Sequence, residues 1–163
     1  MASRNLAELL RCLVRGNVEC ILVGGMAGVM RGAPVVTADV DIVHNRDSEN
    51  VGRLVKVLEE LQAVYRHDDR RLRPTVSHLL GSGHQLLVTR LGPLDALGAL
   101  DNETYAELVS YSSAMELGEG LTILVLELPK LIELKRNAGR PKDLAVLPVL
   151  EATLELTRKR NRE

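Results

Sequence analysis

Two short apolar runs in the first third of the chain limit what it can fold into. Cys20 to Val23 and Thr37 to Val43 are each too short for a typical helix and are bounded by turn residues, so each predicts a strand. A Gly24-Gly25 pair closes the first run and predicts a turn. The sequence therefore points to a sheet built from short strands with helices between them.

The rest of the chain alternates between helical and strand patterns. Helices are predicted from a cap at Ser3 to the stop at Gly16-Asn17, over Met26–Arg31, after the cap Asp47-Ser48, near Val76–Leu80, over Thr104–Val109 and Leu128–Asn137, and from Pro141 onward. Strands are predicted over Gln85–Leu91 and Leu94–Leu100, joined through Gly92-Pro93, and over Ser113–Leu117 and Thr122–Leu126. Pro148 predicts a kink or break in the last helix. This alternation predicts an α+β (mixed α/β) fold with a mixed sheet.

Composition narrows the nature of the core and the class of partner. With 163 residues the chain is long enough for one domain with a real core. It has no Phe, no Trp and three Tyr, so the core must be aliphatic. The same scarcity argues against readers of single-stranded nucleic acid that stack bases on aromatic side chains. A net charge of −1 gives no overall attraction to nucleic acid.

Cysteine usage and hydropathy suggest a reduced compartment. Cys12 and Cys20 lie on different predicted elements without a C-x-x-C pair, so neither a disulfide framework nor a zinc site is expected. No run approaches the roughly 20 apolar residues of a membrane span, and the N-terminal segment lacks the form of a signal peptide. We therefore expect a cytoplasmic protein without a membrane partner.

Two aspartates in the second apolar run carry the first indication of chemistry. Asp39 and Asp41 are two residues apart, so in a strand they project from one face together with Thr37, while Val40 and Ile42 face the core. Adjacent like charges repel and destabilise a strand. A divalent cation with hard oxygen ligands between the two carboxylates would remove that repulsion. The alternative is a pair of surface carboxylates on a solvated face.

A third aspartate, Asp95, is a further candidate for this cluster. Asp95 opens the predicted strand Leu94–Leu100 and would join the other two carboxylates if its strand lay beside theirs. Spacing alone does not fix that register, and after Pro93 the residue is also an ordinary turn residue. The role of Gly24-Gly25 also has two interpretations: it is either a tight turn or a place where a ligand approaches the backbone closely.

These motifs together resemble the nucleotidyltransferase superfamily, which has a polymerase β-like fold. The resemblance lies in Ile21-Leu22-Val23-Gly24-Gly25-Met26-Ala27, in Thr37-Ala38-Asp39-Val40-Asp41 and in a lone aspartate on a later strand. The segment Leu134 to Asp143 is similar to the Lys-Arg-x-x-x-Arg-x-Lys-Asp ending of the abortive-infection and toxin–antitoxin type. The resemblance implies a mixed sheet flanked by helices in a single domain over residues 1–163, with residues 128–163 as a helical segment packed on it.

The resemblance also implies a reaction. Such enzymes transfer NMP from an NTP to a hydroxyl acceptor, here an RNA end, a protein side chain or a small molecule. Asp39 and Asp41 would hold two Mg²⁺ or Mn²⁺ ions, and Asp95 would complete the metal site and take the proton from the attacking hydroxyl. A cognate toxin or antitoxin is the partner that this branch suggests.

Nucleotide-binding candidates follow from the same comparison. Gly24, Gly25 and Thr37 would lie along the triphosphate, and a basic segment would contact its phosphates or base; its candidates are Lys135, Arg136, Arg140 and Lys142. Cations at a helix C-terminus also complement the helix dipole without any ligand, so the structural alternative stays open. One departure from the family pattern is Met26, where many members place a serine after the glycine.

Two other functions compete with this one. A nucleotidyltransferase fold that acts as a non-catalytic binding module, antitoxin-like or regulatory, is consistent with the small size of the chain and the missing serine. A D-x-D glycosyltransferase would also use paired carboxylates on a metal-bound diphosphate, but the chain is short for that class and the spacing from Gly24-Gly25 fits it less well.

Overall fold

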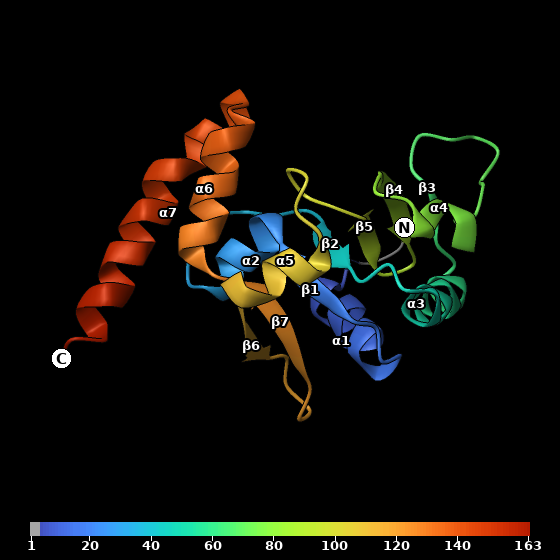
Figure 1. Cartoon of the computed structure of the whole chain (residues 1–163), viewed down its shortest axis with the longest axis horizontal. Helices are drawn as coiled ribbons and strands as arrows, with labels where there is room; N and C mark the ends of the chain where they lie inside the picture. Colours follow the sequence, from blue (N-terminus) through green and yellow to red (C-terminus); the bar gives the residue numbers. More distant parts are fainter. Residues whose placement is uncertain (1–3) are drawn as a thin grey trace.

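The sheet and its surrounding helices confirm the predicted α+β class. The computed structural model describes residues 4–163, so the cap expected at Ser3 lies outside the described residues. Within them, the first helix is capped by Asn5, whose side chain accepts a hydrogen bond from the Glu8 amide at 3.1 Å. The described chain forms a seven-stranded mixed sheet with helices around it (Figure 1).

The strands are short, and their order places distant segments side by side. The order across the sheet is β3-β4-β5-β2-β1-β7-β6. The β1–β7 and β2–β5 pairs are parallel, and β1–β2, β3–β4, β4–β5 and β6–β7 are antiparallel. The strands are β1 (Cys20–Val23), β2 (Val40–His44), β3 (Val64–Tyr65), β4 (His84–Thr89), β5 (Gly92–Leu97), β6 (Ser112–Glu116) and β7 (Thr122–Leu126).

Helices gather at both ends of this sheet. Figure 1 shows α6 and α7 side by side at one end and α3 with α4 at the other. The helices are α1 (Leu6–Arg15), α2 (Gly24–Met30), α3 (Ser48–Glu60), α4 (Val76–Leu80), α5 (Tyr105–Leu108) with the 3₁₀ turn Val109–Tyr111, α6 (Leu128–Ala138) and α7 (Pro141–Arg160).

The core is aliphatic, as the composition predicts. Its largest fully buried side chains are all leucine or isoleucine: Leu9, Leu10, Leu13, Ile21, Leu22, Ile42, Leu54, Leu58, Leu61, Leu79, Leu87 and Leu94. They come from helices and strands along most of the chain and belong to a single hydrophobic cluster. Burial of this cluster is the main force that holds the helices on the sheet.

Two boundaries near the carboxylates differ from the prediction. The expected strand Thr37 to Val43 begins only at Val40, because the preceding residues form a bend in which the Thr37 hydroxyl donates to the Asp39 carbonyl at 3.1 Å. The turn expected at Gly24-Gly25 is the first turn of α2, which starts at Gly24 rather than at Met26.

The hairpin that carries Asp95 is also shifted. The turn expected at Gly92-Pro93 lies instead at positions 90 and 91, since Thr89 pairs with Gly92. The Thr89 hydroxyl closes this turn: it donates to the Gly92 carbonyl at 2.8 Å and accepts from the Leu91 amide at 3.1 Å. This buried hydroxyl pairs with two backbone groups of the turn, and these contacts outweigh the local preference of Gly92-Pro93 for a turn.

Of the kink or break predicted at Pro148, the break is wrong, because α7 runs from Pro141 to Arg160 as one helix. Pro148 removes one backbone donor from the helix. Leu147 and Leu150, on either side of it, are buried against the rest of the core. Their packing outweighs the cost of one lost hydrogen bond.

A buried asparagine joins the start of α3 to the ends of β1 and β2. The Asn50 side chain is fully buried; it accepts from the Glu19 amide at 2.7 Å and donates to the Glu19 and Asn45 carbonyls at 2.9 and 2.7 Å. All three partners are backbone groups, and an alanine side chain at position 50 could form a hydrogen bond with none of them. Asn50 therefore holds the β1–β2 pair at the end opposite to Asp41.

We expect Asn50→Ala to lower the free energy of unfolding by roughly 1–3 kcal/mol, because it removes the partner of the Glu19 amide and of the Asn45 carbonyl, whereas the Glu19 carbonyl keeps a hydrogen bond from the Asn45 amide. Urea denaturation measures this change. Asn161→Ala, at the exposed end of α7, is the control and should change stability little. Equal effects of the two substitutions would contradict the role given to Asn50.

Candidate metal centre

Adjacent parallel strands bring two of the predicted carboxylates together. Asp41 on β2 is the direct partner of Asp95 on β5 in the parallel register. Residues opposite one another in a sheet project from the same face, so both carboxylates lie on one side. The register that the sequence left open is therefore the one that places Asp95 beside Asp41.

Asp39 reaches the same place from outside the strand. It lies in the bend just before β2, so strict strand alternation does not explain its position. Its carboxylate nevertheless joins those of Asp41 and Asp95: ligand oxygens from all three lie within 4.8 Å of one another. All three residues are half-buried.

The electrostatics of this cluster are unfavourable without a cation. The pKa of Asp41 is raised from 3.8 to about 8, first by burial and then by the carboxylates of Asp39 and Asp95, whereas Lys135 opposes the rise. Removing water from a carboxylate and placing like charges beside it both favour the protonated form. The cluster therefore holds a proton in place of a positive charge near neutral pH.

Two glycines allow the start of α2 to approach the carboxylates. A Cβ at Gly24 would lie 2.1 Å from the Asp41 Oδ2 atom, and Gly24 has a φ of +68°. A Cβ at Gly25 would lie 2.9 Å from the Thr37 Oγ1 atom. These positions require glycine for close approach, so Gly24, Gly25 and Thr37 do border the cluster.

Basic side chains from the α6–α7 junction face the same cluster. Lys135 is close enough to oppose the raised pKa of Asp41, and Asp41 in turn helps to raise the pKa of Arg140, whose main cause is the Asp143 carboxylate. Asp143 accepts from Lys135 at 3.2 Å and from Arg140 at 2.6 Å. Burial alone would raise the pKa of Asp143, but these hydrogen bonds lower it. A buried carboxylate thus holds the two cations in place.

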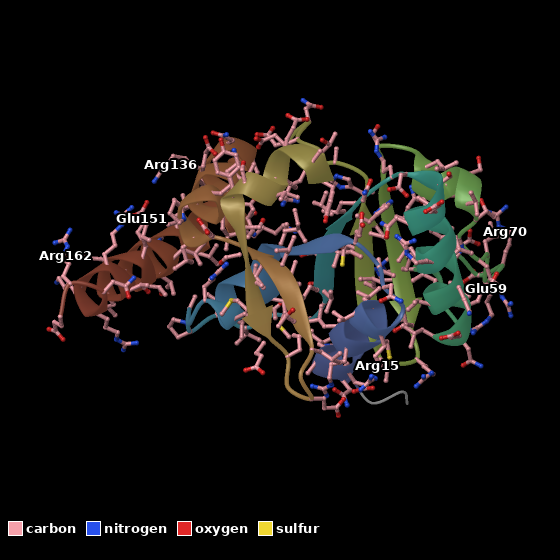
Figure 2. The ribbon with its side chains drawn as sticks, turned by 60° about the horizontal axis from the view of Figure 1, so that its bottom comes forward. Arg15, Glu59, Arg70, Arg136, Glu151 and Arg162 are labelled. Carbon is pink, nitrogen blue, oxygen red and sulfur yellow. The ribbon has the colours of Figure 1, made fainter. Side chains whose placement is uncertain are left out.

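Two other predicted basic residues lie away from this arrangement. Arg136 pairs with Glu151 at 2.6 Å, with both side chains exposed, and Figure 2 shows the two on the outside of the helical pair. Lys142 is exposed in the first turn of α7. The structure therefore brings Lys135 and Arg140 toward the carboxylates and leaves Arg136 and Lys142 on the surface.

The sequence analysis missed one residue of the site. Arg66 forms an ion pair with Asp95, and both side chains are largely buried. No sequence pattern predicts this pair, because the strand before Arg66, β3, has only two residues. Asp143, which positions Lys135 and Arg140, is named in the sequence analysis only as the end of the basic segment that begins at Leu134. Its single signal was a carboxylate within a basic segment.

The donor set fits a hard divalent cation. Three carboxylates on one face supply oxygen ligands of the kind that Mg²⁺ and Mn²⁺ prefer, with positions left for water or phosphate oxygens. Within residues 4–163, no histidine or cysteine, the ligands that zinc or copper would favour, belongs to this cluster.

Comparison with known structures supports the fold. The chain superimposes on the crystal structure of a candidate nucleotidyltransferase from Thermotoga maritima with a TM-score of 0.55. The match covers 96% of this chain and 92% of that chain at 18% sequence identity. The fold is of the nucleotidyltransferase type. No protein-family model matches the sequence, and no curated protein matches it.

None of the helices in residues 4–163 combines the length and the apolar character that a bilayer crossing requires.

We expect Gly24→Ala to destabilise the protein and to displace the Asp41 carboxylate, because the added methyl group collides with it and because the backbone has a positive φ. Gly52→Ala is the matched control: Gly52 lies inside α3 with open space around it, so alanine should raise stability by about 0.5–1 kcal/mol. Thermal unfolding of both variants measures the difference. A Gly24→Ala variant as stable as wild type would refute the close approach.

The raised pKa of Asp41 predicts a pH dependence of stability in the metal-free protein. Between its ordinary value of 3.8 and about 8, the folded state holds a proton that the unfolded state has released. This group's contribution therefore makes the protein less stable as the pH rises through that window. As the pH rises from 5 to 8, the free energy of unfolding of the Asp41→Asn variant should fall less than that of the wild type. Urea denaturation in the presence of EDTA measures both.

Asp69→Asn, which changes an exposed aspartate, should keep the wild-type pH profile. If Asp41→Asn and wild type show the same profile, the carboxylates do not share a proton as described.

Proposed function

We propose that this protein is a metal-dependent nucleotidyltransferase that transfers NMP from an NTP to a hydroxyl acceptor. The observation that carries the proposal is the meeting of Asp39, Asp41 and Asp95 on one face of a nucleotidyltransferase-type sheet. Glycosyl transfer is the weaker alternative, because the sheet has the nucleotidyltransferase arrangement.

The carboxylates divide the work of an in-line displacement at the α-phosphate. Asp39 and Asp41 are the proposed ligands shared by two cations, and Asp95 is the proposed third ligand and the acceptor of the hydroxyl proton. Two Mg²⁺ or Mn²⁺ ions, when bound, would stabilise the charge on the attacking and leaving oxygens. The raised pKa of Asp41 supports this assignment, since the cluster needs positive charge to ionise fully.

The triphosphate is proposed to lie between the start of α2 and the α6–α7 junction. Gly24 and Gly25 leave room for phosphate oxygens beside Thr37, and Lys135 and Arg140 supply positive charge near Asp41. Arg136 and Lys142 remain predicted nucleotide contacts, but their exposed positions make Lys135 and Arg140 the stronger candidates.

The acceptor must supply a hydroxyl group. An RNA end, a protein side chain and a small molecule all offer the hydroxyl that the reaction needs. The segment from Leu134 to Asp143, which resembles the abortive-infection type, supports a cognate toxin or antitoxin as partner. The two cysteines without a C-x-x-C pair support a cytoplasmic setting.

One observation favours a second function. Met26 stands where a serine hydroxyl would contact phosphate in many related enzymes, which weakens the expected grip on a triphosphate. A non-catalytic binding module with this fold would show no heat of binding with any NTP and Mg²⁺ in titration calorimetry. An enzyme would bind at least one of them.

We expect Asp41→Asn to reduce NMP transfer from an α-labelled NTP by more than about a hundredfold, because it removes a direct metal ligand. Asp39→Asn should have a similar effect. Asp69→Asn, a substitution at an exposed aspartate, is the control and should leave the rate unchanged. Transfer by the Asp39/Asp41 double variant at the wild-type rate would overturn the assignment.

A further inference from the structure

Arg66 reaches the carboxylate cluster from the side of β4. Its backbone amide donates to the Leu86 carbonyl at 2.9 Å, which extends the β3–β4 ladder by one residue. Leu86 is in turn the direct partner of Asp95 in the β4–β5 pair. The three residues therefore lie in one row across the sheet, and the Arg66 side chain projects from the same face as Asp95.

The guanidinium group of Arg66 is bonded to the Oδ1 atom of Asp95. The two side chains are only 20% and 17% exposed, so solvent screens this pair less than it would a surface pair. A guanidinium keeps its charge at every accessible pH and offers no atom to a metal. It is therefore a competitor for the Asp95 carboxylate and repels a divalent cation placed there.

The two sources of positive charge flank the cluster from opposite sides. Arg66 comes from the β3–β4 side of β5, whereas Lys135 lies on α6, which packs on α2 beyond β2. Lys135 forms its ion pair with Asp143, which is not a proposed metal ligand. Arg66 forms its ion pair with Asp95, which is one. A cation that binds the Oδ1 atom of Asp95 therefore competes directly with Arg66.

We propose that Arg66 is an internal counter-ion that holds Asp95 in the cation-free protein and competes with a metal ion for its carboxylate. It is thus a positioning residue that weakens metal binding at Asp95 and makes Asp39 and Asp41 the first ligands to engage. The inference rests on the proposed function only in taking Asp95 as a metal ligand; it does not require NMP transfer.

The test is calorimetric titration of Mn²⁺ alone, without nucleotide, into the full chain. We expect Arg66→Gln to lower the Kd for Mn²⁺ by about tenfold, since it removes a charge-assisted hydrogen bond that competes for the carboxylate. Arg66→Lys keeps the charge and should stay within about threefold of wild type. Circular dichroism and thermal unfolding establish that each variant is folded.

The matched control is Arg70→Gln, which removes the same charge from the same segment of the chain. Arg70 pairs with Asp68 and is 75% exposed, and Figure 2 shows it on the surface beyond α3. Its substitution should leave the Kd unchanged, which separates a specific ion pair from a general loss of positive charge.

Each outcome is decisive. Mn²⁺ binding that Arg66→Gln does not tighten, or that Arg70→Gln tightens equally, overturns the role of Arg66 and leaves the nucleotidyltransferase proposal intact. Tighter binding by Arg66→Gln alone supports the role of Arg66, even if no NTP proves to be a substrate. If neither wild type nor Arg66→Gln binds Mn²⁺, both the metal centre and the role of Arg66 are wrong.

Discussion

Repulsion among three carboxylates is the constraint to which the rest of the site responds. Parallel pairing of β2 with β5 forces Asp41 beside Asp95, and the bend before β2 adds Asp39. Burial prevents water from screening these charges, and the pKa of Asp41 rises to about 8 as a result. A chain keeps such an arrangement at a cost in stability, which is typical of functional sites rather than of structural ones.

The surrounding residues reduce that repulsion in three different ways. A shared proton on the cluster removes one charge, the pair with Arg66 neutralises Asp95, and Lys135 places a positive charge near Asp41. Asp143 keeps Lys135 and Arg140 in position from a fully buried site between α6 and α7. The C-terminal helices are therefore electrostatically part of the site, although they lie at one end of the molecule (Figure 1).

Local patterns allowed much of the fold to be predicted. The aliphatic core, the short strands and the hairpins of the second half follow from composition, from the length of the apolar runs and from turn residues. Predictions failed where tertiary contacts outweighed a local signal. Leu147 and Leu150 carry α7 across Pro148, and the Thr89 hydroxyl moves the β4–β5 turn away from Gly92-Pro93.

The sequence by itself determined which groups can perform the chemistry: a pair of aspartates two residues apart, two glycines without side chains and a basic segment near the C-terminal end. Only the tertiary structure decided which of them meet. Asp95 joins Asp41 through a pairing of strands more than fifty positions apart, and Arg66 reaches Asp95 through the two-residue strand β3. Strand register depends on the packing of the whole sheet, so no local spacing encodes it.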